Sequence, residues 1–221
     1  AGERAVALMR ASVKAAQRPE TVGDFGGFAG LFDASALTKY RKPLLATSTD
    51  GVGTKVAVAR AMDLHDTIGI DLVAMVVDDL VVVGAEPLFL TDYIATGAVV
   101  PERIAAIVAG IATGCQLAGC ALLGGETAEH PGLMAPDEYD VAGAATGVVE
   151  ADALLGPDRV VAGDVIVAMG ASGLHSNGYS LARYVLLSDK GPGLHTYLPE
   201  IDRTVGEELL EPTRIYAKDC L

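Results

Sequence analysis

Residues 67–83 constrain the fold of this chain more than any other segment. They are mostly Val, Leu, Ile, Met and Ala; Asp66 stands where it can cap a helix, Gly84 can end that helix, and Pro87 follows shortly after. A helix that is apolar on nearly all sides must be buried on several faces. The chain therefore has to build layers of structure around this helix.

The rest of the sequence alternates between two patterns. Short apolar and β-branched runs predict strands, and apolar residues three and four apart predict helices. The predicted strands are residues 44–49, 88–94, 120–123 and 139–149, the predicted helices are residues 3–17, 54–61 and 101–118, and the predicted loops are residues 23–28 and 124–132. In a chain of 221 residues that is 51% hydrophobic, this alternation indicates an α/β or α+β fold with a substantial core.

The alternation pauses after the last of these strands, and a second unit then begins. The predicted linker is residues 151–163, followed by a strand at 164–169, a helix at 179–187 and a helical stretch at 205–221. We expect two domains, residues 1–156 and residues 157–221, and the second domain is expected to be incomplete.

Charge excludes two classes of partner. Sixteen Lys and Arg against 29 Asp and Glu give a net charge of −13, so nucleic acid and anionic membranes would be repelled. The apolar runs are too short to span a bilayer, and the start has no signal-peptide pattern. The three cysteines and four histidines lack the spacing of a zinc site. We expect a cytosolic protein with reduced cysteines.

Three aspartates interrupt the apolar helix. At roughly 100° per residue, Asp78 lies about 20° from Asp71, and Asp79 lies about 80° away on the other side. Nothing cationic stands within a turn of them in the sequence, and unpaired buried carboxylates are costly. A divalent cation such as Mg²⁺ would remove that cost. The alternative is a stripe of solvated aspartates on a half-exposed helix.

Two glycine-containing segments follow predicted strands. At residues 50–55, Asp50 and Lys55 flank glycines that would let a phosphate approach the backbone, with an ordinary glycine turn as the alternative. Residues 124–129 repeat the design, with two glycines followed by carboxylates. Residues 176–179 stand at the start of a predicted helix. The backbone amides there could hold a phosphate. The alternative is that Ser or Asn simply caps the helix. Asp92 interrupts a predicted apolar strand. It is either a further metal ligand or simply a residue at the end of the strand.

Together these segments resemble the phosphoribosylformylglycinamidine cyclo-ligases, also called aminoimidazole ribonucleotide synthetases, of purine biosynthesis. The matching segments are Ser-Thr-Asp-Gly-Val-Gly-Thr-Lys at 48–55, His-Asp-Thr-Ile-Gly-Ile-Asp at 65–71, Asp79 with Gly-Ala-Glu-Pro at 84–87, Gly-Gly-Glu-Thr-Ala-Glu at 124–129 and His-Ser-Asn-Gly-Tyr-Ser-Leu at 175–181. The third segment alone marks a wider superfamily of ATP-using enzymes. Two positions depart from the family pattern: Asp78 stands where many relatives have Asn, and His130 where Met is common.

The resemblance implies a mixed-sheet N-terminal ATP-binding domain that pairs its sheet across a homodimer, followed by an α+β C-terminal domain. It implies that ATP phosphorylates the amide oxygen of formylglycinamidine ribonucleotide, and that ring closure then releases phosphate. The expected site comprises Lys55 and Glu126 as catalytic residues; Asp50, Gly51, Gly53, Thr54, Lys55, Gly124, Gly125 and Thr127 for the nucleotide; Ser176, Asn177, Gly178 and Tyr179 for the substrate phosphate; and Asp50, Asp79 and Asp92 for Mg²⁺.

Two other functions remain open at this point. One is a different ATP-dependent reaction of the same superfamily. Selenophosphate synthetase is disfavoured, because it needs a reactive cysteine near its N-terminus and the first cysteine here is Cys115. The other is a nucleotide-binding dimerisation fragment without turnover.

Overall fold

A mixed four-stranded sheet forms the centre of the protein. The computed structural model describes residues 1–23, 27 and 29–221, so most of the loop predicted at 23–28 lies outside the described residues. The strand order is β3-β6-β4-β5, with β4 and β5 parallel and the other neighbours antiparallel. The strands are β3 (Pro43–Gly51), β4 (Glu86–Thr96), β5 (Ala121–Glu129) and β6 (Tyr139–Glu150). The predicted mixed α/β architecture is confirmed.

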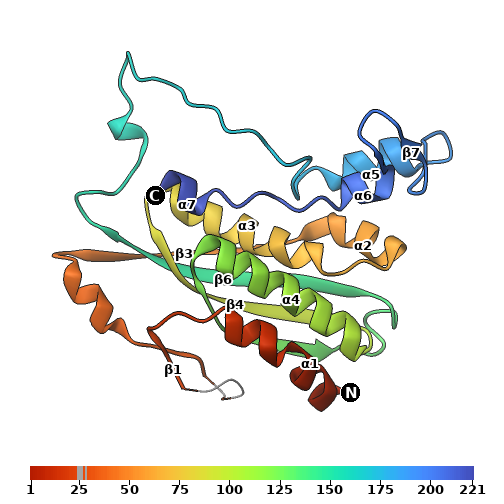
Figure 1. Cartoon of the computed structure of the whole chain (residues 1–221), viewed down its shortest axis with the longest axis horizontal. Helices are drawn as coiled ribbons and strands as arrows, with labels where there is room; N and C mark the ends of the chain where they lie inside the picture. The colour runs from red at the N-terminus through yellow and green to blue at the C-terminus, as the bar shows by residue number, and fades with distance from the viewer. Residues whose placement is uncertain (24–26, 28) are drawn as a thin grey trace.

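Three helices cover one face of this sheet (Figure 1). They are α1 (Gly2–Ala15), α3 (Thr67–Val82) and α4 (Pro101–Ala118). α3 packs on β3, β4 and β6 and against α4, and α4 packs against α1. Ile68, Leu72 and Ile111 are fully buried in the core, as the apolar pattern of α3 requires. No helix of the described residues is long and apolar enough to cross a bilayer.

Two glycines let α3 and α4 cross closely. A Cβ at Gly110 would overlap the carbonyl oxygen of Asp66, and a Cβ at Gly69 would overlap the backbone around Ile107 and Ile111. α4 ends at Gly119, in the left-handed region at φ 78°, as predicted. Asp66 occupies the N-cap position of α3, but its side chain makes no capping hydrogen bond. The expected cap is therefore wrong in its chemistry, although the helix begins where predicted.

The opposite face of the sheet carries no helix among the described residues. Side chains alternate along β4, so that Leu90 and Ile94 point into the helical layer while Tyr93 is 42% exposed. On β3, Leu45 is 65% exposed on the same open face. Near one end, Phe32 covers Phe89, with ring centroids 5.2 Å apart.

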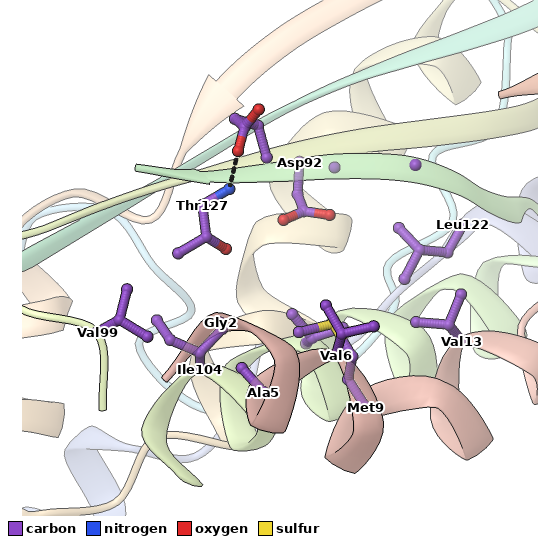
Figure 2. A pocket seen from close by; sticks show the side chains of 14 residues that line it. Gly2, Ala5, Val6, Met9, Val13, Asp92, Val99, Ile104, Leu122 and Thr127 are labelled. Carbon is purple, nitrogen blue, oxygen red and sulfur yellow. Dashed lines mark hydrogen bonds between the residues drawn. The ribbon is translucent and has the colours of Figure 1, made fainter. Parts of the chain in front are cut away.

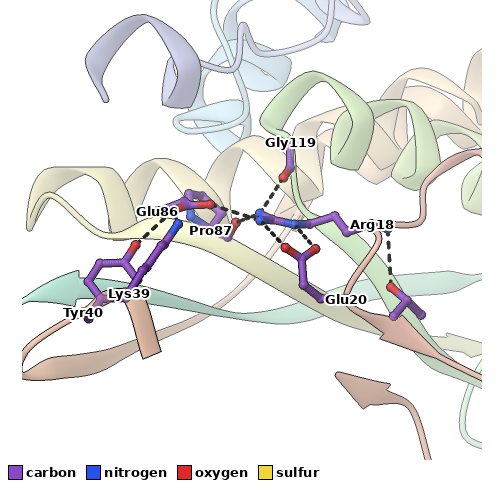
Figure 3. Close-up of polar contacts among 8 residues, drawn as sticks. Arg18, Glu20, Lys39, Tyr40, Glu86, Pro87 and Gly119 are labelled. Carbon is purple, nitrogen blue, oxygen red and sulfur yellow. Dashed lines mark hydrogen bonds and ion pairs between the residues drawn. The ribbon is translucent and has the colours of Figure 1, made fainter. Parts of the chain in front are cut away.

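An arginine ties the segment after α1 to the start of β4 (Figure 3). The Arg18 guanidinium donates to the Glu20 carboxylate at 3.2 Å, to the Glu86 carboxylate at 3.1 Å and to the carbonyl oxygens of Pro87 and Gly119. The Tyr40 hydroxyl donates to the other Glu86 oxygen at 3.1 Å. This network holds the short elements β1 (Thr21–Val22), β2 (Leu31–Phe32) and η1 (Ala34–Lys39) against the sheet.

The first part of the loop predicted at 124–132 is strand instead. β5 continues to Glu129, because residues 124–129 pair in parallel with residues 91–96 of β4 after a register shift at Leu90 and Thr91. The predicted helix at 54–61 begins with a 3₁₀ turn, η2 (Gly53–Lys55), before α2 (Val56–Met62).

The chain after β6 leaves the sheet as a long arm and returns beside α2 and α3 (Figure 1). The predicted helix at 179–187 is α5 (Tyr179–Leu187). The predicted strand at 164–169 is not formed: Ile166 is 95% exposed, and the described residues supply no partner strand for the backbone hydrogen bonds that a strand needs. The helix predicted at 205–221 is broken around Pro212, which cannot donate a helical hydrogen bond.

The remaining elements of this part are short. They are η3 (Pro157–Arg159), β7 (Tyr197–Leu198), β8 (Arg203–Thr204), α6 (Val205–Leu209) and α7 (Ala217–Cys220). The boundary between residues 156 and 157 stays a prediction.

Candidate functional site

The turn after β3 carries the first group of predicted site residues. Asp50 lies near the end of the strand, and its Oδ1 accepts a hydrogen bond from the Gly51 amide at 2.7 Å. Gly53 adopts φ 70°, a conformation that favours glycine. Thr54 is exposed, and its Oγ1 lies 3.3 Å from Ser180 Oγ on α5. The turn therefore contacts the beginning of α5.

Lys55 is fully buried beneath this turn. Its Nζ lies 2.8 Å from Asp71 Oδ2 on α3 and donates to the carbonyl oxygens of His175 at 2.9 Å and Glu211 at 2.7 Å. Burial lowers the pKa of Lys55, an effect that the Asp71 charge opposes. Burial likewise raises the pKa of Asp71, opposed by Lys55 and by Thr213.

This pair gives Asp71 a cation that the search within one helical turn of the sequence did not find. Lys55 stands sixteen residues earlier in the sequence, beyond the reach of a helical-turn argument. Asp71 also accepts from the Thr213 amide at 2.8 Å and the Thr213 hydroxyl at 2.6 Å. Protein groups thus donate hydrogen bonds to Oδ1 of Asp71, while Oδ2 faces the Lys55 ammonium as an ion pair. In this arrangement the Lys55 ammonium faces these oxygens rather than solvent, and its contact with a phosphate stays a prediction.

The two other aspartates of α3 lie on the exposed flank of the helix. Asp79 is exposed and accepts a hydrogen bond from Ser48 Oγ on β3 at 2.9 Å. Asp78 accepts from the Tyr216 amide at 3.1 Å. Burial, together with the charge of Asp79, raises the pKa of Asp78 to about 6. Asp79 is therefore the more accessible carboxylate for a ligand.

The segment at 175–178 lies against the turn and α3. Ser176 is buried, and its hydroxyl donates to the Val52 carbonyl oxygen at 2.9 Å. Asn177 is exposed and approaches Met75, one turn before Asp79 on α3. Gly178, at φ 77°, begins α5 without a side-chain cap. The structure therefore brings the predicted phosphate segment beside the predicted metal aspartate.

Tyr179, the fourth residue expected at the substrate phosphate, points into the core instead. Its hydroxyl donates to the Leu209 carbonyl oxygen at 2.5 Å, and the side chain is 2% exposed. Of the four predicted phosphate residues, the structure leaves Asn177 and Gly178 exposed and uses the side chains of Ser176 and Tyr179 for internal hydrogen bonds.

The second group of site residues lies on β5. Gly125 pairs with Asp92 on β4, and a Cβ at Gly125 would overlap the Asp92 carboxylate. Asp92 is 9% exposed, and burial raises its pKa to about 7. Glu126 accepts a hydrogen bond from the Thr127 amide at 2.9 Å. With Gly124, these residues line a cavity of about 250 Å³ that α1 and α4 close from the other side (Figure 2).

The structure separates these two groups. β6 and β4 lie between β3 and β5, so the turn at 50–55 and the glycines of β5 lie at opposite edges of the sheet. Asp50, Asp79 and Asp92 are not gathered: the described residues contain no cluster of three or more His, Cys, Asp or Glu side chains placed to hold a metal ion. Their roles as metal ligands stay predictions.

Comparison with protein families identifies the chain. Residues 32–149 match the family described as AIR synthase related protein, N-terminal domain, and residues 161–221 match the corresponding C-terminal domain. The chain belongs to the AIR synthase related protein family. The predicted recognition is confirmed by curated relatives within this family.

The curated relatives carry the name phosphoribosylformylglycinamidine cyclo-ligase. The one from Geobacillus kaustophilus is 57% identical over 218 residues, covering 99% of this chain and 63% of the relative. The one from Brevibacillus brevis is 55% identical over 221 residues, covering 100% of this chain and 64% of the relative. The chain thus spans slightly less than two thirds of the length of these AIR synthase relatives.

Solved structures share the fold. A thiamine-monophosphate kinase from Stenotrophomonas maltophilia aligns with a TM-score of 0.60 at 19% identity, covering 97% of this chain and 62% of the kinase. The hydrogenase maturation protein HypE of E. coli aligns with a TM-score of 0.54 at 17% identity, covering 74% of this chain and 48% of HypE. At these identities, the two alignments show only that these solved structures share the fold of this AIR synthase related chain.

Proposed function

We propose that this protein catalyses the ATP-dependent cyclisation of formylglycinamidine ribonucleotide to aminoimidazole ribonucleotide. The observation that carries the proposal is 57% identity, across nearly the whole chain, to a relative named phosphoribosylformylglycinamidine cyclo-ligase. The amide oxygen of the substrate attacks the γ-phosphorus of ATP, and ADP leaves. An amidine nitrogen then attacks the activated carbon, phosphate leaves and the imidazole ring closes.

The chemistry asks the protein mainly for positioning and charge neutralisation around the transferred phosphoryl group. Asp79, which is exposed, and Asp50, which is half-buried, are the residues proposed to hold Mg²⁺, because carboxylate oxygens suit this ion. The fit is supported by the Ser48 hydroxyl 2.9 Å from Asp79, since a hydroxyl is a further hard oxygen donor at that place. Mg²⁺, when bound, would neutralise negative charge on the phosphates.

The phosphate of the ribonucleotide is proposed to bind at residues 176–178. Asn177 and Gly178 are exposed at the start of α5, and helix N-termini favour anions. Ser176 is proposed to hold this segment on the turn through the Val52 carbonyl. Lys55 and Glu126 remain the proposed catalytic residues. For Lys55, a catalytic role requires that its ammonium rotates away from Asp71 toward the loop at residues 50–54 when ligands bind.

A homodimer is proposed as the active form. The nucleotide-binding residues lie in two groups at opposite edges of the sheet, and we propose that the second group of each site comes from another copy. The sheet face without helices carries Leu45 and Tyr93, 65% and 42% exposed. Covering such an apolar face with a second copy would bury it from water.

The test is phosphate release from MgATP by the full-length protein, with and without formylglycinamidine ribonucleotide, while the aminoimidazole product is followed. We expect phosphate release that depends on substrate and matches product one to one. Asp79→Ala should remove Mg²⁺-dependent nucleotide binding, and the exposed Asp189→Ala should not. ATP turnover without aminoimidazole product would reject the cyclo-ligase in favour of another reaction of the superfamily.

A further inference from the structure

Two of the three cysteines of the chain lie where α4 leads into β5. Cys115, in the last turn of α4, is 0% exposed, and Cys120, between the two elements, is 3% exposed. Both are free thiols, and neither has a part in the proposed phosphate chemistry. A free cysteine packs in a core as a small apolar residue, so burial alone gives these thiols no role. What distinguishes them is their placement relative to each other.

The turn that ends α4 brings the two side chains together. Gly119 adopts the left-handed region at φ 78°, and the Cys120 amide donates to the Cys115 carbonyl oxygen at 3.0 Å. This bond across six residues is the Schellman arrangement of a helix C-terminus, in which the first and last side chains often touch. The two thiols share a hydrogen bond, which together with burial raises the pKa of Cys115. The pair is therefore a preformed dithiol.

The apolar cavity between β5, α1 and α4 leads toward this dithiol (Figure 2). At roughly 100° per residue, Cys115 lies about 20° from Val108 around α4, and Val108 lines the cavity. Cys120 stands two residues before Leu122, which also lines the cavity, and residues two apart in an extended chain point to the same side. The Asp92 charge, from the sheet side, raises the pKa of Cys115 further. The dithiol thus lies behind the cavity wall, where local movement would expose it.

Two thiols held in contact favour one reaction with an external disulfide. Cys120 is the expected attacking thiol, because it is slightly exposed, whereas Cys115 is fully enclosed and its raised pKa keeps it protonated. The product of the first attack is a mixed disulfide on Cys120. The Cys120 thiol then no longer contributes to the raised pKa of Cys115. Cys115 can therefore displace the external group, at the high effective concentration of an intramolecular reaction.

We propose that Cys115 and Cys120 form a redox site that low-molecular-weight disulfides convert reversibly into an intramolecular disulfide. The Cys120 sulfur bonds to one sulfur of the reagent, whose S–S bond breaks and releases one thiolate. The Cys115 sulfur then bonds to the Cys120 sulfur, and the second thiolate leaves. The dithiol loses two electrons, the reagent gains two, and the two thiol protons pass to the released thiolates. This inference does not depend on which reaction the protein catalyses.

The new bond would fasten the junction between α4 and β5. Gly119 lies inside the loop that the bond closes, and its carbonyl oxygen accepts a hydrogen bond from Arg18, which also holds Glu86 (Figure 3). The start of β5 would then be fixed both by the bond and by the Arg18 network.

The experiment treats the folded full-length protein with oxidised glutathione, alkylates the remaining thiols, digests the protein with trypsin and measures the peptide masses. Residues 104–159 form one tryptic peptide, because no Lys or Arg precedes Arg159 in it, and its two cysteines are Cys115 and Cys120. We expect this peptide to escape alkylation and to be two hydrogen atoms lighter, and dithiothreitol to reverse the change.

The same protein unfolded in urea is the positive control for the reagent. A peptide that stays reduced in the folded protein, after the unfolded control has been oxidised, would overturn the proposal. So would glutathione attached to both cysteines without the loss of two hydrogen atoms.

Single variants test the order of the two steps. Cys115→Ala should accumulate glutathione on Cys120, because the thiol that would displace it is missing. Cys120→Ala should react at least about tenfold more slowly, because an enclosed, protonated thiol is a poor nucleophile. Faster reaction of Cys120→Ala than of Cys115→Ala would overturn the proposed order.

A matched pair of core variants tests the route through the cavity wall. Val108→Ala widens the wall beside Cys115, and Val58→Ala removes the same two methyl groups from the buried side of α2, away from the cavity. Oxidation should be several-fold faster in Val108→Ala than in Val58→Ala. Rates that follow only the free energy of unfolding of each variant would show that oxidation requires global unfolding, and would overturn the site in the folded protein.

Discussion

At the scale of single residues, the buried pair of Lys55 and Asp71 joins three parts of the chain. Lys55 reaches the carbonyl oxygens of His175 and Glu211, and Asp71 receives two hydrogen bonds from Thr213. The pair therefore holds the chain at His175 and at residues 211–213 against the turn after β3. Its position explains how residues distant in sequence come to flank one site.

Replacing Lys55 by Met should destabilise the fold strongly. The variant would leave Asp71 buried without its cation, and breaking such a pair costs about 3–5 kcal/mol. Urea unfolding measures the loss. The double variant Lys55→Met with Asp71→Leu removes both charges and should recover most of the stability. A double variant no more stable than Lys55→Met alone would contradict this account of the pair.

Asp78 should make stability depend on pH in the acidic range. Its pKa is about 6 in the folded protein, against 3.8 for an ordinary aspartate. Between those values the folded state holds a proton that the unfolded state has released, so stability falls as pH rises from about 4 to 6 and stays lower above.

Asp78→Asn removes that titration. We expect a gain of about 1 kcal/mol at pH 7, discounted for partial solvent exposure, and a flatter profile between pH 4 and 6. Thermal unfolding at a series of pH values, without Mg²⁺, measures both. A variant whose profile parallels the wild type would assign the slope to other groups.

At the scale of elements, the crossing of α3 and α4 sets the helical layer. Gly110→Ala should destabilise the protein by about 1–3 kcal/mol, because the new Cβ overlaps the Asp66 carbonyl oxygen. Helix propensity alone would predict that Gly110→Ala stabilises the protein, because Ala favours the helix more than Gly does. Gly2→Ala is the matched control, since a Cβ there meets nothing within 4 Å, and it should be neutral or slightly stabilising. Chemical unfolding of both variants decides the matter.

Helices and strands differ in how well the sequence pattern predicts them. The predicted helices 101–118 and 179–187 agree with α4 and α5, because a helix is specified by local spacing, capping and breaker residues. The extension of β5 through Gly124 and Gly125 was not predicted. Glycines signal a loop locally, and only pairing with β4 makes them strand. The expected strand at 164–169 failed for the converse reason, because the described residues give it no partner.

At the scale of the whole molecule, the proposed dimer predicts complementation between two defective variants. Asp79→Ala damages the β3 edge and Gly125→Ala damages the β5 edge. If each site combines the two edges from different copies, a mixed dimer carries one intact site. With random exchange, about half of the dimers are mixed, so about a quarter of wild-type turnover should return.

Product formation after mixing the two variants measures this effect. Copies carrying different tags confirm that mixed dimers have formed, and each variant mixed with itself is the control. Mixed dimers without restored turnover would show that each site is built within one chain.

By itself, the sequence determined the family, the α/β class and the residue types of the candidate site. These depend on short-range patterns: strand and helix periodicity, and motifs such as the turn at 50–55. The tertiary structure alone decided which of those residues meet. It paired Lys55 with Asp71, placed Asp92 in an apolar cavity opposite Gly125, and put the two nucleotide groups at opposite sheet edges. The physical reason is that strand order and burial arise from contacts between distant segments, which local spacing does not encode.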